Sequence, residues 1–196
     1  MKKALFLDRD GIINEVVKKL SVSHKKVIDD SPFNLSELRF VLGIKELVQQ
    51  ARGKGYKPLI ITNQPSILKG ECSLRDYEEI TTEICIFLGL KRGDVFECLH
   101  KEGFSLKCNC RKPAPDLFLM AKGVHNIDLK KSVMIGDSWK DILSAKSVGI
   151  GKTIFLKRKE TNKQLGNLQD QELMKEKNIF PDYFCDNLFE VIKALD

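Results

Sequence analysis

Residues 3–11 read KALFLDRDG, and this stretch carries the first indication of the fold. The run KALFLD (3–8) is short, apolar and ends in an acid, which is typical of a buried parallel strand. A second acid, Asp10, follows two residues after Asp8, and Gly11 permits a turn there. Two carboxylates this close repel each other unless a cation lies between them or one is protonated. The stretch therefore predicts a buried strand that delivers a pair of acids to a site.

The rest of the chain alternates between apolar runs and helical patterns. We expect strands at 3–8, 56–62, 94–100, 132–137, 152–156 and 182–185, and helices at 43–55, 73–90, 114–125, 138–149 and 187–195. This alternation predicts one α/β domain over residues 1–196 with a mainly parallel sheet. Two segments fall outside the alternation, 12–42 and the cysteine-rich 98–110, and both are interpreted as inserts.

Composition narrows the class of protein. The chain has 196 residues, of which 42% are hydrophobic, enough for a sizeable core. No apolar run approaches the roughly 20 residues that span a bilayer, and the N-terminal run is too short for a signal peptide, so we expect a cytoplasmic protein. The net charge of +6 favours anionic partners, but its basic residues are dispersed. A nucleic-acid partner is therefore less favoured than a solvated loop at KRKETNK (157–163). A monomer is the default expectation.

Three expected strands end in polar groups that suit chemistry. They are DRDG at 8–11, TNQ at 62–64 and GDSWKD at 136–141. Because ligands bind at the carboxyl ends of strands in open α/β sheets, we expect these groups to meet. Asp8, Asp10 and Asp137 would then offer hard oxygen ligands to Mg²⁺. A single strand-end acid usually caps a turn or helix, but three together favour a metal site.

The stretch CLHKEGFSLKCNCRK (98–112) indicates a second kind of metal site. Cys98, His100, Cys108 and Cys110 supply three thiolates and one imidazole, a full tetrahedral shell for Zn²⁺. No ligand position is left open, so we expect a structural rather than a catalytic zinc. The alternative is chance placement in an ordinary loop. An Fe–S or redox role is less favoured because C-x-x-C spacing is absent.

The strand-end groups, taken in chain order, resemble the four motifs of the haloacid dehalogenase-like (HAD) phosphatases. The matching segments are FLDRDG at 6–11, TNQ at 62–64, Lys112 and GDSWKD at 136–141. The resemblance covers essentially the whole chain and implies a three-layer, Rossmann-like sandwich. It further implies that Asp8 is the nucleophile that forms an aspartyl-phosphate, and that Asp10 is the general acid and base.

The same resemblance assigns roles to further residues. Thr62 and Asn63 would bind the transferring phosphoryl group, with Gln64 as an additional substrate-binding residue. Lys112 would offset phosphate charge. Asp141 would orient Lys112 or a water on the metal ion.

The zinc pattern followed by RKP also resembles one branch of this superfamily. That branch holds the D-glycero-D-manno-heptose 1,7-bisphosphate 7-phosphatases and the histidinol-phosphate phosphatases. The resemblance implies no large cap domain, a zinc loop that forms part of the substrate wall, and Arg111 in contact with the distal part of the substrate. It implies Mg²⁺-dependent removal of the 7-phosphate from the heptose bisphosphate. Histidinol phosphate or another small phosphomonoester is the alternative substrate, and a nucleic-acid 3′-phosphatase or an inactive zinc-stabilised binding module is less favoured.

Overall fold

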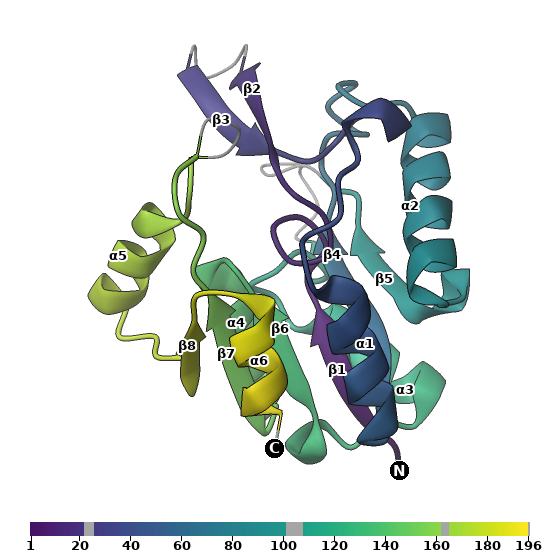
Figure 1. Cartoon of the computed structure of the whole chain (residues 1–196), viewed down its shortest axis with the longest axis vertical. Helices are drawn as coiled ribbons and strands as arrows, with labels where there is room; N and C mark the ends of the chain where they lie inside the picture. The colour runs from purple at the N-terminus through teal and green to yellow at the C-terminus, as the bar shows by residue number, and fades with distance from the viewer. Residues whose placement is uncertain (22–25, 101–107, 162–164, 196) are drawn as a thin grey trace.

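A six-stranded parallel sheet forms the centre of the molecule. The computed structural model describes residues 1–21, 26–100, 108–161 and 165–195 (Figure 1). The strand order is β5-β4-β1-β6-β7-β8, and every neighbouring pair is parallel. The strands are β1 Lys3–Leu7, β4 Tyr56–Asn63, β5 Val95–Cys98, β6 Val133–Gly136, β7 Lys152–Leu156 and β8 Tyr183–Cys185. The strand that ends at Asp8 therefore lies between β4 and β6, whose ends carry the other expected motifs.

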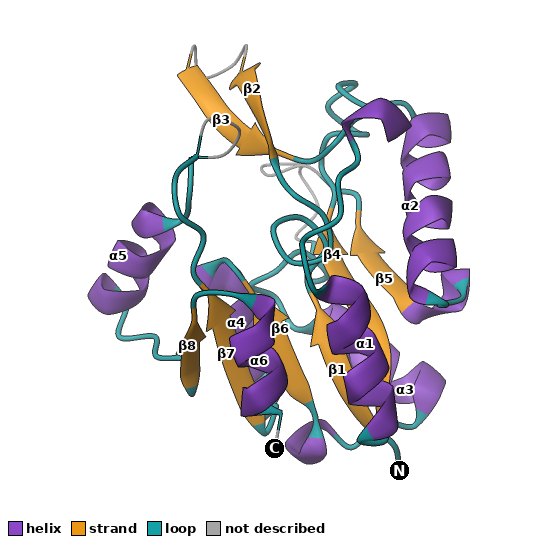
Figure 2. Ribbon diagram, in the orientation of Figure 1, coloured by secondary structure: helices purple, strands orange, loops and turns teal. Residues whose placement is uncertain are grey.

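Helices cover both faces of the sheet, which gives three layers (Figure 2). They are α1 Ile44–Gly53, α2 Leu74–Leu88, α3 Asp116–His125, α4 Trp139–Ser147, α5 Leu168–Glu176 and α6 Leu188–Ala194. Successive β1 residues point to opposite faces. Leu5 packs in one core cluster with α1, α2 and α6, whereas Phe6 packs in the other with α3 and α4. The expected three-layer α/β sandwich is confirmed, and the described residues form no large cap domain over it.

The expected helices and strands are present, with ends that shift by a few residues. The start of the helix expected at 73–90 is an example. The Ser73 side chain accepts a hydrogen bond from the Asp76 backbone N–H at 3.0 Å, and α2 begins at the next residue, Leu74. A serine in this position satisfies one of the N–H groups that a helix start leaves without a partner.

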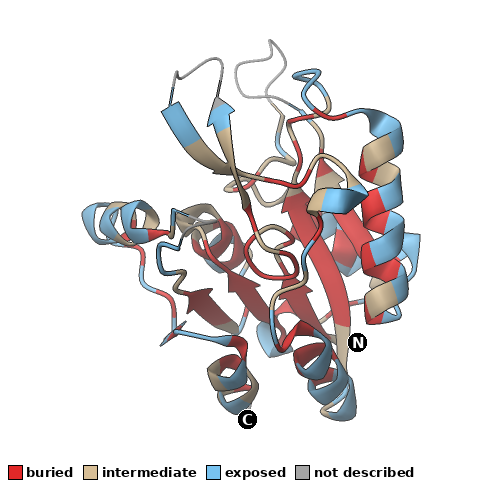
Figure 3. Ribbon diagram, turned by 45° about the horizontal axis from the view of Figure 1, so that its top comes forward, coloured by how far each residue is buried: buried red, intermediate tan, exposed pale blue. Residues whose placement is uncertain are grey.

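The 12–42 insert contains two strands that the sequence did not indicate. The strands β2 Val17–Ser21 and β3 Lys26–Asp30 form an antiparallel hairpin, which lies beyond the carboxyl ends of the central sheet (Figure 1). Much of this hairpin is half-buried or exposed, in contrast to the fully buried central strands (Figure 3). The helix α5 is the other unexpected element. Neither belongs to the alternation that builds the sheet.

Among residues 1–21, 26–100, 108–161 and 165–195, no helix is both long enough and apolar enough to cross a bilayer.

Candidate active site

Three carboxylates meet at the carboxyl ends of β1 and β6. Asp8 follows β1, and its backbone N–H donates to the Ile135 carbonyl at 3.0 Å, which ties the two strand ends together. Asp8, Asp137 and Asp141 each offer an oxygen, and these atoms all lie within 4.8 Å of one another. Asp137 and Asp141 are buried, while Asp8 keeps partial exposure. A cluster of hard oxygen donors with one exposed side fits a divalent cation such as Mg²⁺.

Asp10 is held outside this cluster. Its carboxylate accepts hydrogen bonds from Asn14 Nδ2 at 2.9 Å and Gln64 Nε2 at 2.5 Å, and it pairs with Arg9 Nη2 at 3.2 Å. These donors occupy both carboxylate oxygens. The carboxylate oxygens that lie together are those of Asp8, Asp137 and Asp141, and the expected part of Asp10 in the metal site stays a prediction.

Lys112 connects two of the clustered acids. Its Nζ lies 2.8 Å from Asp8 Oδ1 and 2.6 Å from Asp141 Oδ1, and it donates to the Ile61 carbonyl at 2.8 Å. The side chain is only 3% exposed. Burial opposes the charge of Lys112, but Asp141 and Asp8 outweigh it and raise the lysine pKa above its usual range. The lysine is therefore charged, and its contact with Asp141 agrees with the orienting role expected for that acid.

Burial also changes the ionisation of the clustered acids. Desolvation raises the pKa of Asp8 to about 7, with Asp141 adding to the shift and Lys112 opposing it. Desolvation likewise raises the pKa of Asp137 to about 6, although the Arg158 guanidinium opposes this change. Without a cation, the Asp8 carboxyl is only partly ionised at neutral pH, and the Asp137 carboxyl takes up its proton at a higher pH than an ordinary aspartate does. A divalent cation would favour the charged forms, which a nucleophilic carboxylate and metal ligands require.

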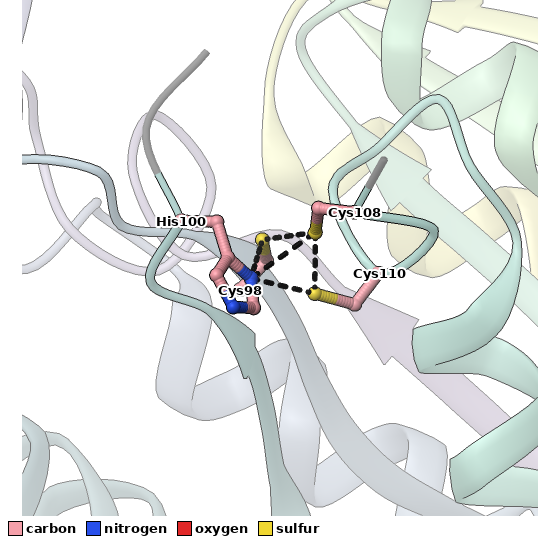
Figure 4. A group of neighbouring side chains, drawn as sticks. All are labelled: Cys98, His100, Cys108 and Cys110. Atoms are coloured by element: carbon pink, nitrogen blue, oxygen red, sulfur yellow. Dashed lines mark hydrogen bonds between the residues drawn. The ribbon is translucent and has the colours of Figure 1, made fainter. Parts of the chain in front are cut away.

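The four expected zinc ligands form a separate cluster (Figure 4). His100 Nδ1 faces the three sulfurs, at 3.5 Å from Cys98, 3.1 Å from Cys108 and 3.3 Å from Cys110. The Cys108 and Cys110 sulfurs are 2.9 Å apart, and no cysteine among the described residues is in a disulfide. Three sulfurs and a nitrogen converging on one point suit the tetrahedral shell of Zn²⁺. The loop residues 101–107 between them lie outside the described residues.

Comparison with known proteins places this geometry in a family. The model of the haloacid dehalogenase-like hydrolases matches residues 3–149. A D-glycero-beta-D-manno-heptose-1,7-bisphosphate 7-phosphatase of Helicobacter pylori is 39% identical over 158 residues, covering 79% of this chain and 83% of that protein. The chain belongs to the heptose-1,7-bisphosphate 7-phosphatase family of the haloacid dehalogenase-like hydrolases. The family assignment agrees with the resemblance carried by the motifs.

Other members of the family support the assignment over more of the chain. A D-glycero-alpha-D-manno-heptose-1,7-bisphosphate 7-phosphatase of Campylobacter jejuni is 31% identical over 189 residues, covering 90% of this chain and 98% of that protein. The crystal structure of a D,D-heptose 1,7-bisphosphate phosphatase from B. bronchiseptica, complexed with magnesium and phosphate, matches with a TM-score of 0.70. That structure is 19% identical and covers 98% of this chain and 97% of its own, which supports the fold.

The side chains of the second family motif, TNQ (62–64), form hydrogen bonds with other site residues. Gln64 is only 2% exposed; its Nε2 donates to Thr62 Oγ1 at 2.8 Å as well as to Asp10, and its Oε1 accepts from Arg9 at 2.6 Å. Asn63 exchanges two hydrogen bonds with the Lys112 backbone, at 3.1 and 3.0 Å. In this arrangement Gln64 holds Asp10, and Asn63 holds the backbone of Lys112. The expected contact of both residues with substrate stays a prediction.

A pocket of about 260 Å³ opens beside the acids. Its wall includes Asp10 and Asp137 together with Asn63, Arg111 and Arg158. Arg111 therefore lies in the pocket wall, and its contact with the distal part of the substrate stays a prediction. The Arg111 guanidinium also donates to the His100 carbonyl at 3.4 Å, which links the zinc cluster to the pocket wall.

Arg158 is a site residue that the sequence did not indicate. The loop at 157–163 was expected to be solvated, but the Arg158 side chain is only 13% exposed. Its Nε donates to Asp137 Oδ2 at 2.5 Å, and its Nη1 donates to Asp29 Oδ2 at 2.9 Å. The expectation is wrong for this residue because partners 21 and 129 positions away neutralise its charge. Asn14 was also missed as a site residue, although the FLDRDG-x-x-N pattern contains it.

Proposed function

We propose that the protein is a Mg²⁺-dependent phosphatase that removes the 7-phosphate from D-glycero-D-manno-heptose 1,7-bisphosphate. The observation that carries this proposal is the placement of Asp8 at the exposed side of a carboxylate cluster, with a buried charged lysine 2.8 Å away. The names of relatives in Helicobacter pylori and Campylobacter jejuni support the substrate.

Asp8 acts as the nucleophile in the first half of the reaction. Its carboxylate oxygen bonds to phosphorus, and the bond from phosphorus to the sugar oxygen at C7 breaks. Asp10 gives a proton to that leaving oxygen, so the sugar departs as an alcohol. The products of this half-reaction are the dephosphorylated sugar and an aspartyl-phosphate on Asp8.

Asp10 acts as a base in the second half. It takes a proton from a water molecule whose oxygen bonds to the phosphorus, and the bond from phosphorus to Asp8 breaks. Inorganic phosphate leaves, and both aspartates return to their starting states. The donors from Gln64 and Asn14 hold the Asp10 carboxylate in one orientation for both proton transfers.

Charge neutralisation comes from a cation and from Lys112. Mg²⁺ held by Asp8, Asp137 and Asp141 would offset the charge between the nucleophile and the phosphoryl group. The Lys112 Nζ lies beside Asp8 Oδ1 and would contact the phosphoryl oxygens as negative charge develops on them. Thr62 is proposed as a further phosphoryl contact; in this structure its Oγ1 accepts a hydrogen bond from Gln64 Nε2.

The thiolate and imidazole cluster is proposed to bind a structural Zn²⁺. Its four ligands fill a tetrahedral shell, so the ion has no free position for substrate. The cluster fixes the start and end of the 98–110 loop. The next two residues are Arg111 in the pocket wall and Lys112 at the nucleophile, so the zinc orders the part of the chain that meets phosphate.

A substrate panel with added Mg²⁺ tests the proposal. The panel contains both anomers of the heptose bisphosphate, histidinol phosphate and a 3′-phosphorylated oligonucleotide, with phosphate release as the readout. We expect the highest kcat/KM for one heptose bisphosphate anomer and no release by Asp8→Asn. Glu46→Gln, on the exposed surface of α1, is the control and should behave as wild type. Histidinol phosphate as the best substrate would overturn the substrate assignment, and unchanged release by Asp8→Asn would overturn the mechanism.

A further inference from the structure

Residues 157–161 and 165–167, which follow β7, reach the candidate metal site although they contain none of the family motifs. The contact is made by Arg158, which lies between Asp137 and Asp29. We propose that Arg158 is a positioning residue for Asp137, held in place by Asp29 and Asn167. The inference rests on the cation site of the proposed function and adds to it a residue outside the motifs.

Asn167 fastens the loop to the backbone of the metal site. Its Nδ2 donates to the Asp137 carbonyl at 2.7 Å and to the Leu156 carbonyl at 2.9 Å. Its Oδ1 accepts from the Arg158 backbone N–H at 2.8 Å. Asn167 is 2% exposed, so these bonds are protected from water. One buried amide thus joins the end of β7, the Arg158 backbone and the backbone of Asp137.

Gly166 lets the loop close against itself. Its φ of +76° lies in the left-handed region, and a Cβ there would lie 2.8 Å from the Glu160 nitrogen and 2.9 Å from the Arg158 carbonyl oxygen. Any other residue would therefore push the two arms of the loop apart. The backbone at Arg158 is thus held by the hydrogen bond to Asn167 and by the close packing at Gly166.

Asp29 holds the far end of the guanidinium. Its Oδ2 accepts from Arg158 Nη1 at 2.9 Å, and its Oδ1 accepts from the Leu165 backbone N–H at 2.9 Å. The Lys18 Nζ adds a bond from the same hairpin to the Thr161 carbonyl at 2.9 Å. The β2–β3 hairpin is therefore docked on the loop, and Arg158 connects this hairpin to Asp137.

The contacts distinguish a positioning role from an anion-binding role. The planar guanidinium is engaged by one carboxylate at Nε and by another at Nη1, which compensates its charge on two sides. Binding a phosphate would require breaking at least one of these pairs. Holding Asp137 requires no such change, because the Nε donor occupies Oδ2 and leaves Oδ1 for a cation. Partners that orient metal ligands in this way typically change metal affinity by about 10–100-fold when they are removed.

Two uncharged replacements separate orientation from charge. In Arg158→Gln, the amide Nε2 stands the same number of bonds from Cα as the arginine Nε, so a donor to Asp137 is retained. In Arg158→Met, an apolar methyl group takes that place. Neither variant carries the positive charge, so a difference between them reports the donor alone. We expect the Mn²⁺ dissociation constant of Arg158→Met to exceed that of Arg158→Gln by about 10-fold or more.

Mn²⁺ binding to the full chain, followed by electron paramagnetic resonance, measures this difference without reference to turnover. Lys159→Gln, an exposed change in the same loop, is the control and should bind as wild type does. Equal affinity of Arg158→Gln and Arg158→Met, with tight binding by wild type, would overturn the positioning role. Absence of binding by wild type would overturn both the cation site and this inference.

A double-mutant comparison tests the role of Asp29. Asp29→Ala should weaken Mn²⁺ binding several-fold in the wild-type background, because the guanidinium loses its second anchor. The same change should have little effect in the Arg158→Met background, since no guanidinium remains to be anchored. Equal effects in both backgrounds would show that Asp29 acts independently of Arg158, and would overturn the proposed connection.

Discussion

Lys112→Met should destabilise the metal-free protein, because Lys112 is the buried cation that two of the clustered carboxylates share. Methionine has a similar length and fills the space, so the change removes charge more than volume. The three contacts that disappear are those of Nζ with Asp8, Asp141 and the Ile61 carbonyl, at 2.6–2.8 Å.

The expected loss follows from the burial of these partners. Removing one member of a buried ion pair leaves an uncompensated charge and costs about 3–5 kcal/mol. Asp141 is 1% exposed and cannot recover hydration, whereas Asp8 is 14% exposed and can be partly rehydrated. We therefore expect a loss of about 3–5 kcal/mol, most of it from Asp141. In a domain of this size, that corresponds to a Tm lower by roughly 6–20 °C.

Urea unfolding at pH 8 measures the loss. The buffer should contain no added Mg²⁺ and no chelator, because a chelator would also strip a bound zinc. Lys122→Met is a matched control at an exposed position on α3, where we expect a change within about 0.5 kcal/mol. Saturating Mg²⁺ should reduce the difference between Lys112→Met and wild type, since the cation replaces part of the missing charge.

A loss below about 1 kcal/mol, similar to that of the control, would refute the reasoning. It would mean that water or protonation compensates the carboxylates without the lysine. The electrostatic role given to Lys112 in the reaction would then lose its structural basis.

Three further predictions concern protons, zinc and Gln64. Because the pKa of Asp8 is raised to about 7 and that of Asp137 to about 6, the metal-free protein should gain stability as pH falls from 7 toward 4. Mg²⁺ binding should release roughly one proton per site at pH 6 and almost none at pH 8.5, as calorimetry in two buffers would show; pH-independent release would contradict this. Cys110→Ser should lose zinc by elemental analysis, whereas Cys185→Ser, at a buried cysteine outside the cluster, should retain it. Gln64→Leu should lower kcat about 10-fold or more with little change in KM, because Gln64 orients the acid–base group; a raised KM with unchanged kcat would instead indicate a direct substrate contact.

The sheet could be predicted from the sequence because its buried strands are continuous apolar runs between helical patterns. The hairpin escaped prediction for the opposite reason. VKKLS (17–21) and KVIDD (26–30) carry charges at several positions, and the second is partly exposed, so neither shows the pattern of a buried strand. The helix α5 buries only Met174, which leaves its apolar periodicity too weak to recognise.

The site residues, too, could be predicted only in part. The acids could be predicted because a parallel sheet brings its strand ends together, whatever the side chains do afterwards. The directions of individual side chains could not. Gln64 turns inward to Asp10 only because Arg9 and Thr62 offer it buried partners. Arg158 contacts Asp137 only because β6, β7 and the residues after β7 pack together. No local sequence pattern therefore indicates this contact.

The charges that the fold gathers explain why cation and phosphate should bind together. When all are ionised, the three carboxylates of Asp8, Asp137 and Asp141 outnumber by one the cations that they contact, which are the buried Lys112 and the largely buried Arg158. That excess repels a phosphate dianion, and the Asp141 carboxylate adds to the burial that raises the pKa of Asp8. A divalent cation would make the net charge of the site positive and would favour the ionised form of Asp8. The same ion that makes Asp8 reactive therefore also makes the pocket attractive to phosphate, so substrate should bind weakly, and in a non-reactive state, until the cation is present.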